Sequence, residues 1–240
     1  DNMSWYDGSA LMPILETVPI AADRNFLDFR FPVQYVNRPS LNFRGFCGTV
    51  ASGVIRKGDE ISVLPSRQNS RVKSIVTFDE ELELAYADMA ITLTLEEEID
   101  VSRGDVIAHS DNLPASREEL KATLVWMTDN PLLPGKLYDF KLGTKSVSGQ
   151  VKTIRNRIDV NTLTETPAPT LELNEIGLVE ISVDQAVCFD DYKDNRATGS
   201  FIVIDRLSNV TVGAGMINCE QQPKVKRVEP HNIHVTKEER

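Results

Sequence analysis

Short segments that alternate apolar and polar side chains recur roughly every ten residues from Phe26 to Ile217, with turn-forming residues between them. The first segment is residues 26–36, in which the alternate positions hold Phe29, Phe31, Val33 and Tyr35. A period of two is typical of a strand that is buried on one face. Many short strands at this spacing favour a closed barrel or a sandwich. The sequence therefore predicts an all-β protein.

The first half of the chain contains several such strands. A turn is expected at Asn37–Ser40, and the segments Phe46–Ile55 and Glu60–Leu64 are expected to pair as a hairpin with Gly58 at positive φ. Further strands are expected at Arg71–Phe78, Met89–Leu95 and Asp105–His109. The polar, proline-containing segment Ser110–Arg117 has the composition of a linker between domains.

A second group of strands follows this linker. It begins with a clean alternation at Leu120, Ala122, Leu124 and Trp126. It continues at Tyr138–Thr144, Gly149–Asn156, Glu175–Val183, Gly199–Asp205 and Met216-Ile217. The one helix expected is Ser9–Thr17, in which Leu11, Ile14 and Leu15 share a face. The predicted architecture is two consecutive small antiparallel β-barrels.

The stretch Gly48–Ile61 imitates a nucleotide-binding loop, because Gly53 and Gly58 have the spacing of G-x-x-x-x-G-K-[ST]. That loop needs Lys and a hydroxyl after its second glycine, whereas this chain has Asp59 and Glu60, which would repel a triphosphate. The glycines are instead expected to serve a turn at Gly58 and close backbone approach at Gly48 and Gly53.

Charge and cysteine content narrow the classes of partner. The formal net charge is −10, from 26 basic and 36 acidic residues, which disfavours broad binding to nucleic acid or to anionic membranes. No apolar run approaches the roughly 18 residues of a membrane span. The chain begins at Asp1 without a signal peptide and is interpreted as part of a longer chain. Cysteines at 47, 188 and 219 form no framework, which fits a reducing cytoplasm.

Candidate metal ligands do not form a recognised set. His231 and His234 have ligand spacing, but no second ligand pair accompanies them. Two acidic runs lack the spacing and the glycine of a calcium loop and are interpreted as solvated loops. These runs are Glu96, Glu97, Glu98 and Asp100, and Asp184, Asp190, Asp191 and Asp194.

Candidate catalytic groups are equally few. A Ser or Cys nucleophile needs a neighbouring base, and the three histidines, His109, His231 and His234, nominate no triad. Cys47 has apolar strand neighbours and is expected to be packed. The basic cluster Lys224, Lys226 and Arg227 is too short to mark a nucleic-acid surface. No catalytic, cofactor-binding or metal-binding residue is predicted, and the residues indicate a binding module.

Several motifs together resemble the second and third domains of translation-factor GTPases. They occur in the expected order and span most of the chain, which makes the set specific. The first-barrel motifs are Arg44-Gly45, Gly48-Thr49-Val50, Ser52-Gly53, Lys57-Gly58-Asp59-Glu60-Ile61 and Arg103-Gly104-Asp105-Val106-Ile107-Ala108. The second-barrel motifs are Thr198-Gly199-Ser200-Phe201-Ile202-Val203-Ile204-Asp205 and Thr211-Val212-Gly213-Ala214-Gly215.

Within that superfamily the chain resembles the large, GTP-binding subunit of bacterial sulfate adenylyltransferase (ATP sulfurylase). Segments that general elongation factors lack carry this resemblance. They are Trp5-Tyr6-Asp7-Gly8, Val33-Gln34-Tyr35-Val36-Asn37-Arg38-Pro39, Asn42-Phe43-Arg44-Gly45, Glu98-Ile99-Asp100-Val101-Ser102-Arg103-Gly104-Asp105, Val125-Trp126-Met127, Pro131-Leu132-Leu133-Pro134-Gly135, Asn174-Glu175-Ile176-Gly177 and Asp194-Asn195-Arg196-Ala197-Thr198-Gly199.

The resemblance implies a division of the chain and a set of partners. Residues 1–22 would be the end of a GTPase domain, 23–112 and 113–218 the two barrels, and 219–240 a charged tail or linker. The family couples GTP hydrolysis to the formation of adenosine 5′-phosphosulfate and pyrophosphate from ATP and sulfate. GTP and Mg²⁺ would bind in the GTPase domain, and adenylyl transfer would occur in a smaller catalytic subunit. The segment itself is expected to be inactive and to bind these two partners.

Two alternatives remain open at this point. In some family members an adenylylsulfate kinase domain follows the barrels, and residues 232–240 faintly resemble the entry to one. The rival hypothesis for function is a translation-factor barrel pair that binds tRNA or the ribosome. The net charge of −10 and the lack of a basic stripe weigh against it.

Overall fold

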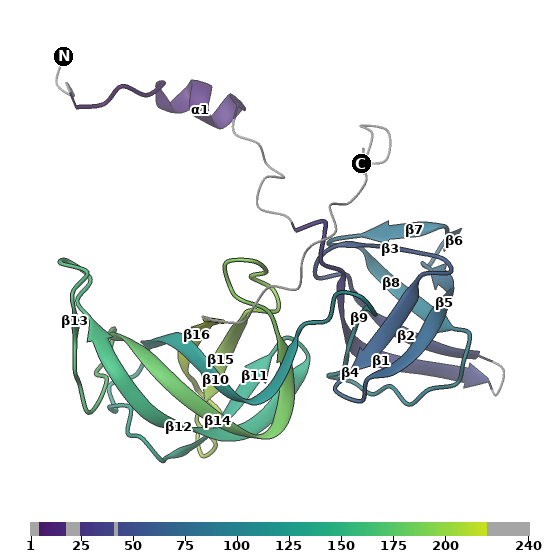
Figure 1. The fold of residues 1–240 in the computed structure, drawn as a ribbon. Helices are drawn as coiled ribbons and strands as arrows, with labels where there is room; N and C mark the ends of the chain where they lie inside the picture. The colour runs from purple at the N-terminus through teal and green to yellow at the C-terminus, as the bar shows by residue number, and fades with distance from the viewer. Residues whose placement is uncertain (1–4, 18–24, 41–42, 220–240) are drawn as a thin grey trace.

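The fold was analysed in a computed structural model that describes residues 5–17, 25–40 and 43–219. Two barrels lie side by side and are joined by the segment between β9 and β10 (Figure 1). Each barrel is a closed ring of six antiparallel strands. The predicted all-β class and the two consecutive antiparallel barrels are therefore confirmed.

The first barrel follows the strand order β4-β9-β1-β2-β8-β5, and pairing between β5 and β4 closes it. Its strands are β1 (Arg30–Ser40), β2 (Phe43–Thr49), β4 (Glu60–Leu64), β5 (Gln68–Val76), β8 (Ala90–Leu95) and β9 (Val106–His109). Three short strands lie outside the ring. They are β6 (Glu81–Leu82), which extends the sheet beside β5, and β3 (Val54–Arg56), which pairs with β7 (Leu84–Tyr86). The sequence did not predict β6 and β7.

The second barrel follows the order β11-β15-β16-β10-β14-β12 and is closed by pairing between β12 and β11. Its strands are β10 (Ala115–Trp126), β11 (Leu137–Leu142), β12 (Lys145–Ile158), β14 (Ile176–Phe189), β15 (Ser200–Ile204) and β16 (Thr211–Ile217), with β13 (Glu165–Thr166) paired to β12. The four predicted apolar positions of β10, from Leu120 to Trp126, are all buried in this barrel's own core. A separate core fills the first barrel.

One prediction of side-chain direction in β1 was wrong. Phe29, Phe31 and Val33 are fully buried, but Tyr35 is 63% exposed. The cause is a β-bulge: Val33 pairs with Gly48 and Tyr35 with Cys47, so β1 has one extra residue there. An extra residue reverses the alternation of the strand, and Val36 packs against the core instead.

A predicted turn and a predicted strand in the first barrel also differ from the structure. Asn37–Ser40 is not a turn, because β1 continues through it and Ser40 pairs with Phe43. The segment Phe46–Ile55 is two strands, β2 and β3, separated at Gly53, which has φ +77°. Close approach is the reason for glycine here, because a Cβ on Gly53 would collide with the backbone of Phe29.

The hairpin predicted at Gly58 does not form, because its two strands do not pair with each other, but the predicted turn is present. Gly58 has φ +88°, as predicted. However, β3 pairs with β7, whereas β4 pairs with β5 and β9, so the turn joins two different sheets. The amide of Gly53 donates to Asn25 O (2.7 Å) and that of Gly58 to Val72 O (2.8 Å). Both glycine amides therefore serve the fold and are not free to cradle a phosphate.

The helix α1 (Leu11–Thr17) begins two residues later than predicted and buries none of its residues. Its apolar side chains face solvent, with Leu11 70% and Leu15 59% exposed, and Trp5 just before it is 77% exposed. A helix normally buries such a face against another element. Among the described residues, no helix has the length and apolar character needed to cross a membrane.

Glycine substitutions provide a matched test of this fold. We expect Gly53→Ala to lower the free energy of unfolding by about 3 kcal/mol or more, because strain at positive φ adds to a backbone collision. Gly58→Ala has the same φ penalty and no atom within 4 Å of its Cβ, so we expect a loss of only about 1–2 kcal/mol. Urea unfolding of both variants measures this, and equal losses would contradict the close approach at Gly53.

Candidate functional site: the junction between the barrels

The junction is centred on the buried guanidinium of Arg30, at the start of β1 in the first barrel. Its side chain is 2% exposed. Nε donates to Asp190 Oδ2 and Nη2 to Asp190 Oδ1, both at 2.9 Å, so the two groups form a bidentate pair. Nη1 donates to the carbonyl oxygens of Phe29 (2.8 Å) and Asn112 (2.7 Å). Nη2 also lies 3.4 Å from Asn112 Oδ1, so all five N–H donors have an acceptor.

The acceptor Asp190 belongs to the second barrel, in the segment between β14 and β15 that spans residues 190–199, here called the junction loop. Its side chain is 14% exposed, and Thr198 Oγ1 also donates to Oδ2 at 2.6 Å. Arg30 and Asp190 are 160 residues apart in the sequence. Their bidentate bond therefore fixes the junction loop against the first strand of the other barrel.

A second polar contact lies beside this pair and uses neutral side chains. Asn195 Nδ2 of the junction loop donates to Ser52 Oγ at 2.7 Å, and Ser52 Oγ donates in turn to the carbonyl oxygen of Asp28. Asn195 is 5% exposed and Ser52 1% exposed. Asn25 Nδ2 also bonds across the junction, to Asp194 O at 3.0 Å. The side-chain amides of Asn195 and Asn25 and the hydroxyl of Ser52 therefore all have hydrogen-bond partners.

A third region of contact places charged and thiol groups near the start of β9, at Gly104 and Asp105. Gly104 of the first barrel has φ +95°, and a Cβ there would lie 2.7 Å from Lys145 Cδ of the second barrel. Burial raises the pKa of Asp105 despite the opposing bond from the Ser102 backbone and the charge of Lys145. Burial also raises the pKa of Cys188 to about 11, and the charge of Asp105 adds to that rise. A hydrogen bond with Ser116 of the same barrel opposes the rise in the pKa of Cys188.

The acidic runs were predicted to be solvated loops, and this is wrong for Asp190 and Asp191, whereas Asp184 and Asp194 of the same run are exposed as predicted. Asp190 is buried against Arg30, and Asp191 Oδ2 accepts from the backbone amide of Cys219 at 2.7 Å. Asp184 is exposed and accepts from the Ser148 amide. In the other run, Asp100 pairs with Arg44 at 3.4 Å, and Glu97 accepts a bond from Ser70. Within the described residues, no group of three or more His, Cys, Asp or Glu could hold a metal.

The other singled-out residues lie apart from the junction pair. His109 Nε2 is 3.3 Å from Asp59 Oδ2. Burial alone would raise the pKa of Asp59, but hydrogen bonds from His109 and from the Arg56 amide together hold it below the ordinary value. Cys47 Sγ lies 3.3 Å from Thr92 Oγ1 and is half-buried. The remaining candidates lie outside the described residues, namely His231, His234, Lys224, Lys226 and Arg227.

Sequence reasoning missed Arg30 because its alternating position predicts a polar residue on the solvent side of β1. The outer face of β1 is polar there, but the second barrel covers it. The only local signal is an arginine between two buried aromatic residues, Phe29 and Phe31. No pattern in the sequence connects that arginine to an aspartate 160 residues later.

Comparisons with known proteins cover nearly the whole chain. Residues 119–218 match the family described as GTP-eEF1A C-terminal domain-like. The chain is 59% identical over 217 residues to the "Bifunctional enzyme CysN/CysC" of Rhodopirellula baltica, covering 90% of this chain and 34% of that protein. It is 56% identical over 231 residues to "Sulfate adenylyltransferase subunit 1" of Alteromonas mediterranea, covering 96% of this chain and 49% of that protein. The chain thus spans half the length of these relatives or less.

A solved structure with the same fold is sup35 complexed with GDP. It aligns with a TM-score of 0.74 over 89% of this chain and 52% of that chain, at 19% sequence identity. This likeness extends the translation-factor resemblance to three dimensions and concerns the fold alone.

Replacing the central arginine should destabilise the chain strongly. We expect Arg30→Leu to lower the free energy of unfolding by about 3–5 kcal/mol, because it leaves Asp190 buried without its cation. Arg157→Leu is the matched control, since it breaks an arginine–carboxylate bond to Glu175 in which Arg157 is 47% exposed, and we expect a loss below about 1 kcal/mol. Urea unfolding tests both, and a small loss for Arg30→Leu would contradict a buried, fixed pair.

The rate of alkylation of the Cys188 thiol can be measured in this chain without any partner protein. With a pKa of about 11 instead of the ordinary 9.0, we expect a thiolate fraction about a hundredfold lower than that of a free thiol at pH 8. Iodoacetamide alkylation followed by mass spectrometry should therefore show slow labelling of Cys188 in the native chain. Arg30→Leu should accelerate it by loosening the junction. Rapid labelling in the wild type would be inconsistent with a closed junction.

Proposed function

Because the chain belongs to the sulfate adenylyltransferase subunit 1 family over the part of that protein it spans, we propose that it is the two-barrel module of a GTP-dependent sulfate adenylyltransferase. The whole enzyme would form adenosine 5′-phosphosulfate and pyrophosphate from ATP and sulfate, coupled to GTP hydrolysis. The observation that carries this proposal is the identity of 56% to a named subunit 1 over 96% of the chain. The sup35 likeness at 19% identity supports the fold but no translation function.

The barrels do not fit a nucleotide site of their own. The two glycine amides that imitate a phosphate loop donate to Asn25 O and Val72 O, and Asp59 stands where that loop needs Lys. GTP and Mg²⁺ would therefore bind in a GTPase domain of the longer protein, and this segment would neither bind nor hydrolyse GTP. Its role is to bind partners.

Two features of the segment suit it to hold partners in a fixed arrangement. The exposed apolar face of α1 lacks cover within the described residues, and the GTPase domain of the same chain would supply that cover. The buried pair of Arg30 and Asp190 makes the two barrels move as one body. A nucleotide-dependent shift of the GTPase domain would then reach the smaller catalytic subunit through both barrels.

The proposed compartment is the cytoplasm. Cys47, Cys188 and Cys219 are free thiols, which suits a reducing environment.

Binding to the smaller catalytic subunit, subunit 2, tests this function directly. We expect the chain, or the longer protein that contains it, to bind purified subunit 2 in isothermal titration calorimetry. We expect no binding to tRNA at the same salt concentration, because the net charge is −10. Failure of both proteins to bind subunit 2, together with salt-sensitive binding to tRNA, would favour a translation-factor function instead.

A further inference from the structure

Asn25, in the segment that leads into β1, uses every hydrogen-bonding group of its side chain. Its Oδ1 accepts from the amides of Leu27 (2.9 Å) and Asp28 (3.0 Å), which closes a tight turn. Its Nδ2 donates to Asp28 Oδ2 (2.7 Å) and to Asp194 O of the junction loop (3.0 Å). Its carbonyl oxygen accepts from the amide of Gly53 at 2.7 Å. This one residue is therefore bonded to both barrels.

The carboxylate of Asp28 links Asn25 to the buried arginine of the junction. Asp28 is 9% exposed, and its Oδ1 accepts from Asn112 Nδ2 at 2.6 Å. The carbonyl oxygen of Asn112 accepts from Arg30, and Arg30 bonds in turn to Asp190. The junction loop holds both Asp190 and an acceptor of Asn25, so these bonds close into a ring. A buried network in which each member is bonded is rigid.

Backbone packing fixes the chain again, a few residues after Asn25. The amide of Arg30 donates to Ser52 O at 3.0 Å. A Cβ on Gly53 would lie 2.3 Å from Phe29 Cα, so the chain at Phe29 cannot shift without moving the first barrel. If the side chain of Asn25 were lost, the fixed part of the chain would begin at Asp28. Three residues of extended chain span about 10 Å, and the chain before the barrels would gain that much slack.

The described chain before Asn25 has no comparable attachment. Within residues 5–17, no residue forms a hydrogen bond to a described residue of either barrel, and α1 buries none of its residues. In the function proposed above, the GTPase domain lies upstream of this point. Any movement of that domain relative to the barrels must pivot before Asn25, because Asn25 itself is held by both barrels.

We propose that Asn25 is the positioning residue at which a nucleotide-dependent shift of the GTPase domain is transferred to the two barrels. The inference rests on the function proposed above and adds the point of transfer to it. Asn25 reaches the first barrel at Gly53 and the second at Asp194, so a displacement at this residue moves the barrels together. Slack at this residue would absorb the displacement before it reached them.

Two variants of Asn25 in the full-length protein, assembled with subunit 2, test this inference. Asn25→Ala removes all four side-chain bonds. Asn25→Asp keeps the acceptor oxygen of the turn, but it loses both donated bonds and places a second carboxylate beside Asp28. We expect both variants to reduce the stimulation of adenosine 5′-phosphosulfate formation by GTP at least about fivefold. GTP hydrolysis and the affinity for subunit 2 should stay within about twofold of wild type.

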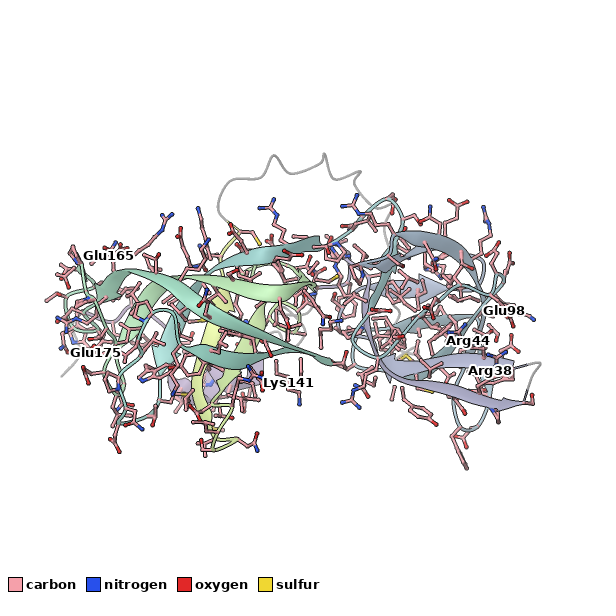
Figure 2. The ribbon with its side chains drawn as sticks, turned by 90° about the horizontal axis from the view of Figure 1, so that it is seen from below. Arg38, Arg44, Glu98, Lys141, Glu165 and Glu175 are labelled. Carbon is pink, nitrogen blue, oxygen red and sulfur yellow. The ribbon has the colours of Figure 1, made fainter. Side chains whose placement is uncertain are left out.

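Asn156→Ala is the matched control, because it also removes a bond between an asparagine and a carboxylate. Asn156 Nδ2 donates to Glu165 Oε2 at 2.8 Å, and Figure 2 shows Glu165 at the end of the second barrel that is farther from the first barrel. We expect full stimulation by GTP in this variant. Thermal unfolding of all three variants checks that the barrels are intact, and we expect midpoints within about 5 °C of wild type.

The outcomes separate this inference from the proposed function. Absence of stimulation by GTP in the wild type overturns the proposed function and the inference with it. Stimulation that persists in both Asn25 variants overturns the inference and leaves the proposed function standing. An equal loss in Asn156→Ala also overturns it, since the effect would then not be specific to Asn25. Unfolding of both Asn25 variants, or their failure to bind subunit 2, overturns it as well, because Asn25 would then maintain the fold instead of transferring movement.

Discussion

The buried guanidinium of Arg30 is the constraint on which the arrangement of the two barrels depends. A closed barrel has no free edge, so two barrels cannot join by pairing strands. They must join through side chains, and burial of a charge is tolerated only when the charge is paired and all its donors are bonded. Arg30 meets that condition only when Asp190, from the other barrel, is in place. The pair therefore selects one relative orientation, and the bonds between Asn195 and Ser52 and between Asn25 and Asp194 fit the same orientation.

The fold was largely predictable, because the period-two pattern directly reports which side chains enter each core. The errors have specific physical causes. The bulge between Val33 and Tyr35 reverses the pattern without any change of residue type. Gly58 was correctly placed at positive φ, but the strands that flank it pair with others, and pairing partners are a property of the whole sheet. The junction was not predictable, because Asp190 in an acidic run looks like a solvated residue until another domain covers it. The alternation of apolar and polar residues predicts the strand to which a residue belongs. It does not predict a contact such as that between Arg30 and Asp190, which are 160 residues apart in the sequence.

The proposed function depends on the surfaces through which this chain would bind its partners. Of the two glycines with phosphate-loop spacing, Gly58 forms a turn and Gly53 packs closely against the backbone of Phe29. The described residues leave the apolar face of α1 uncovered. A fixed junction between the barrels would suit the chain to transmit movement from one partner to another, which is the role proposed for it in sulfate adenylylation.

The rigidity of the junction can be measured directly by double electron–electron resonance between two spin labels. With the native cysteines replaced by serine, labels at Lys73→Cys in the first barrel and Lys121→Cys in the second report the distance between the barrels. A pair at Lys121→Cys and Lys152→Cys within one barrel supplies the reference width. The account predicts a single distance distribution between the barrels, as narrow as the reference and broadened by Arg30→Leu. A broad or multiple distribution in the chain with Arg30 intact would contradict a fixed junction.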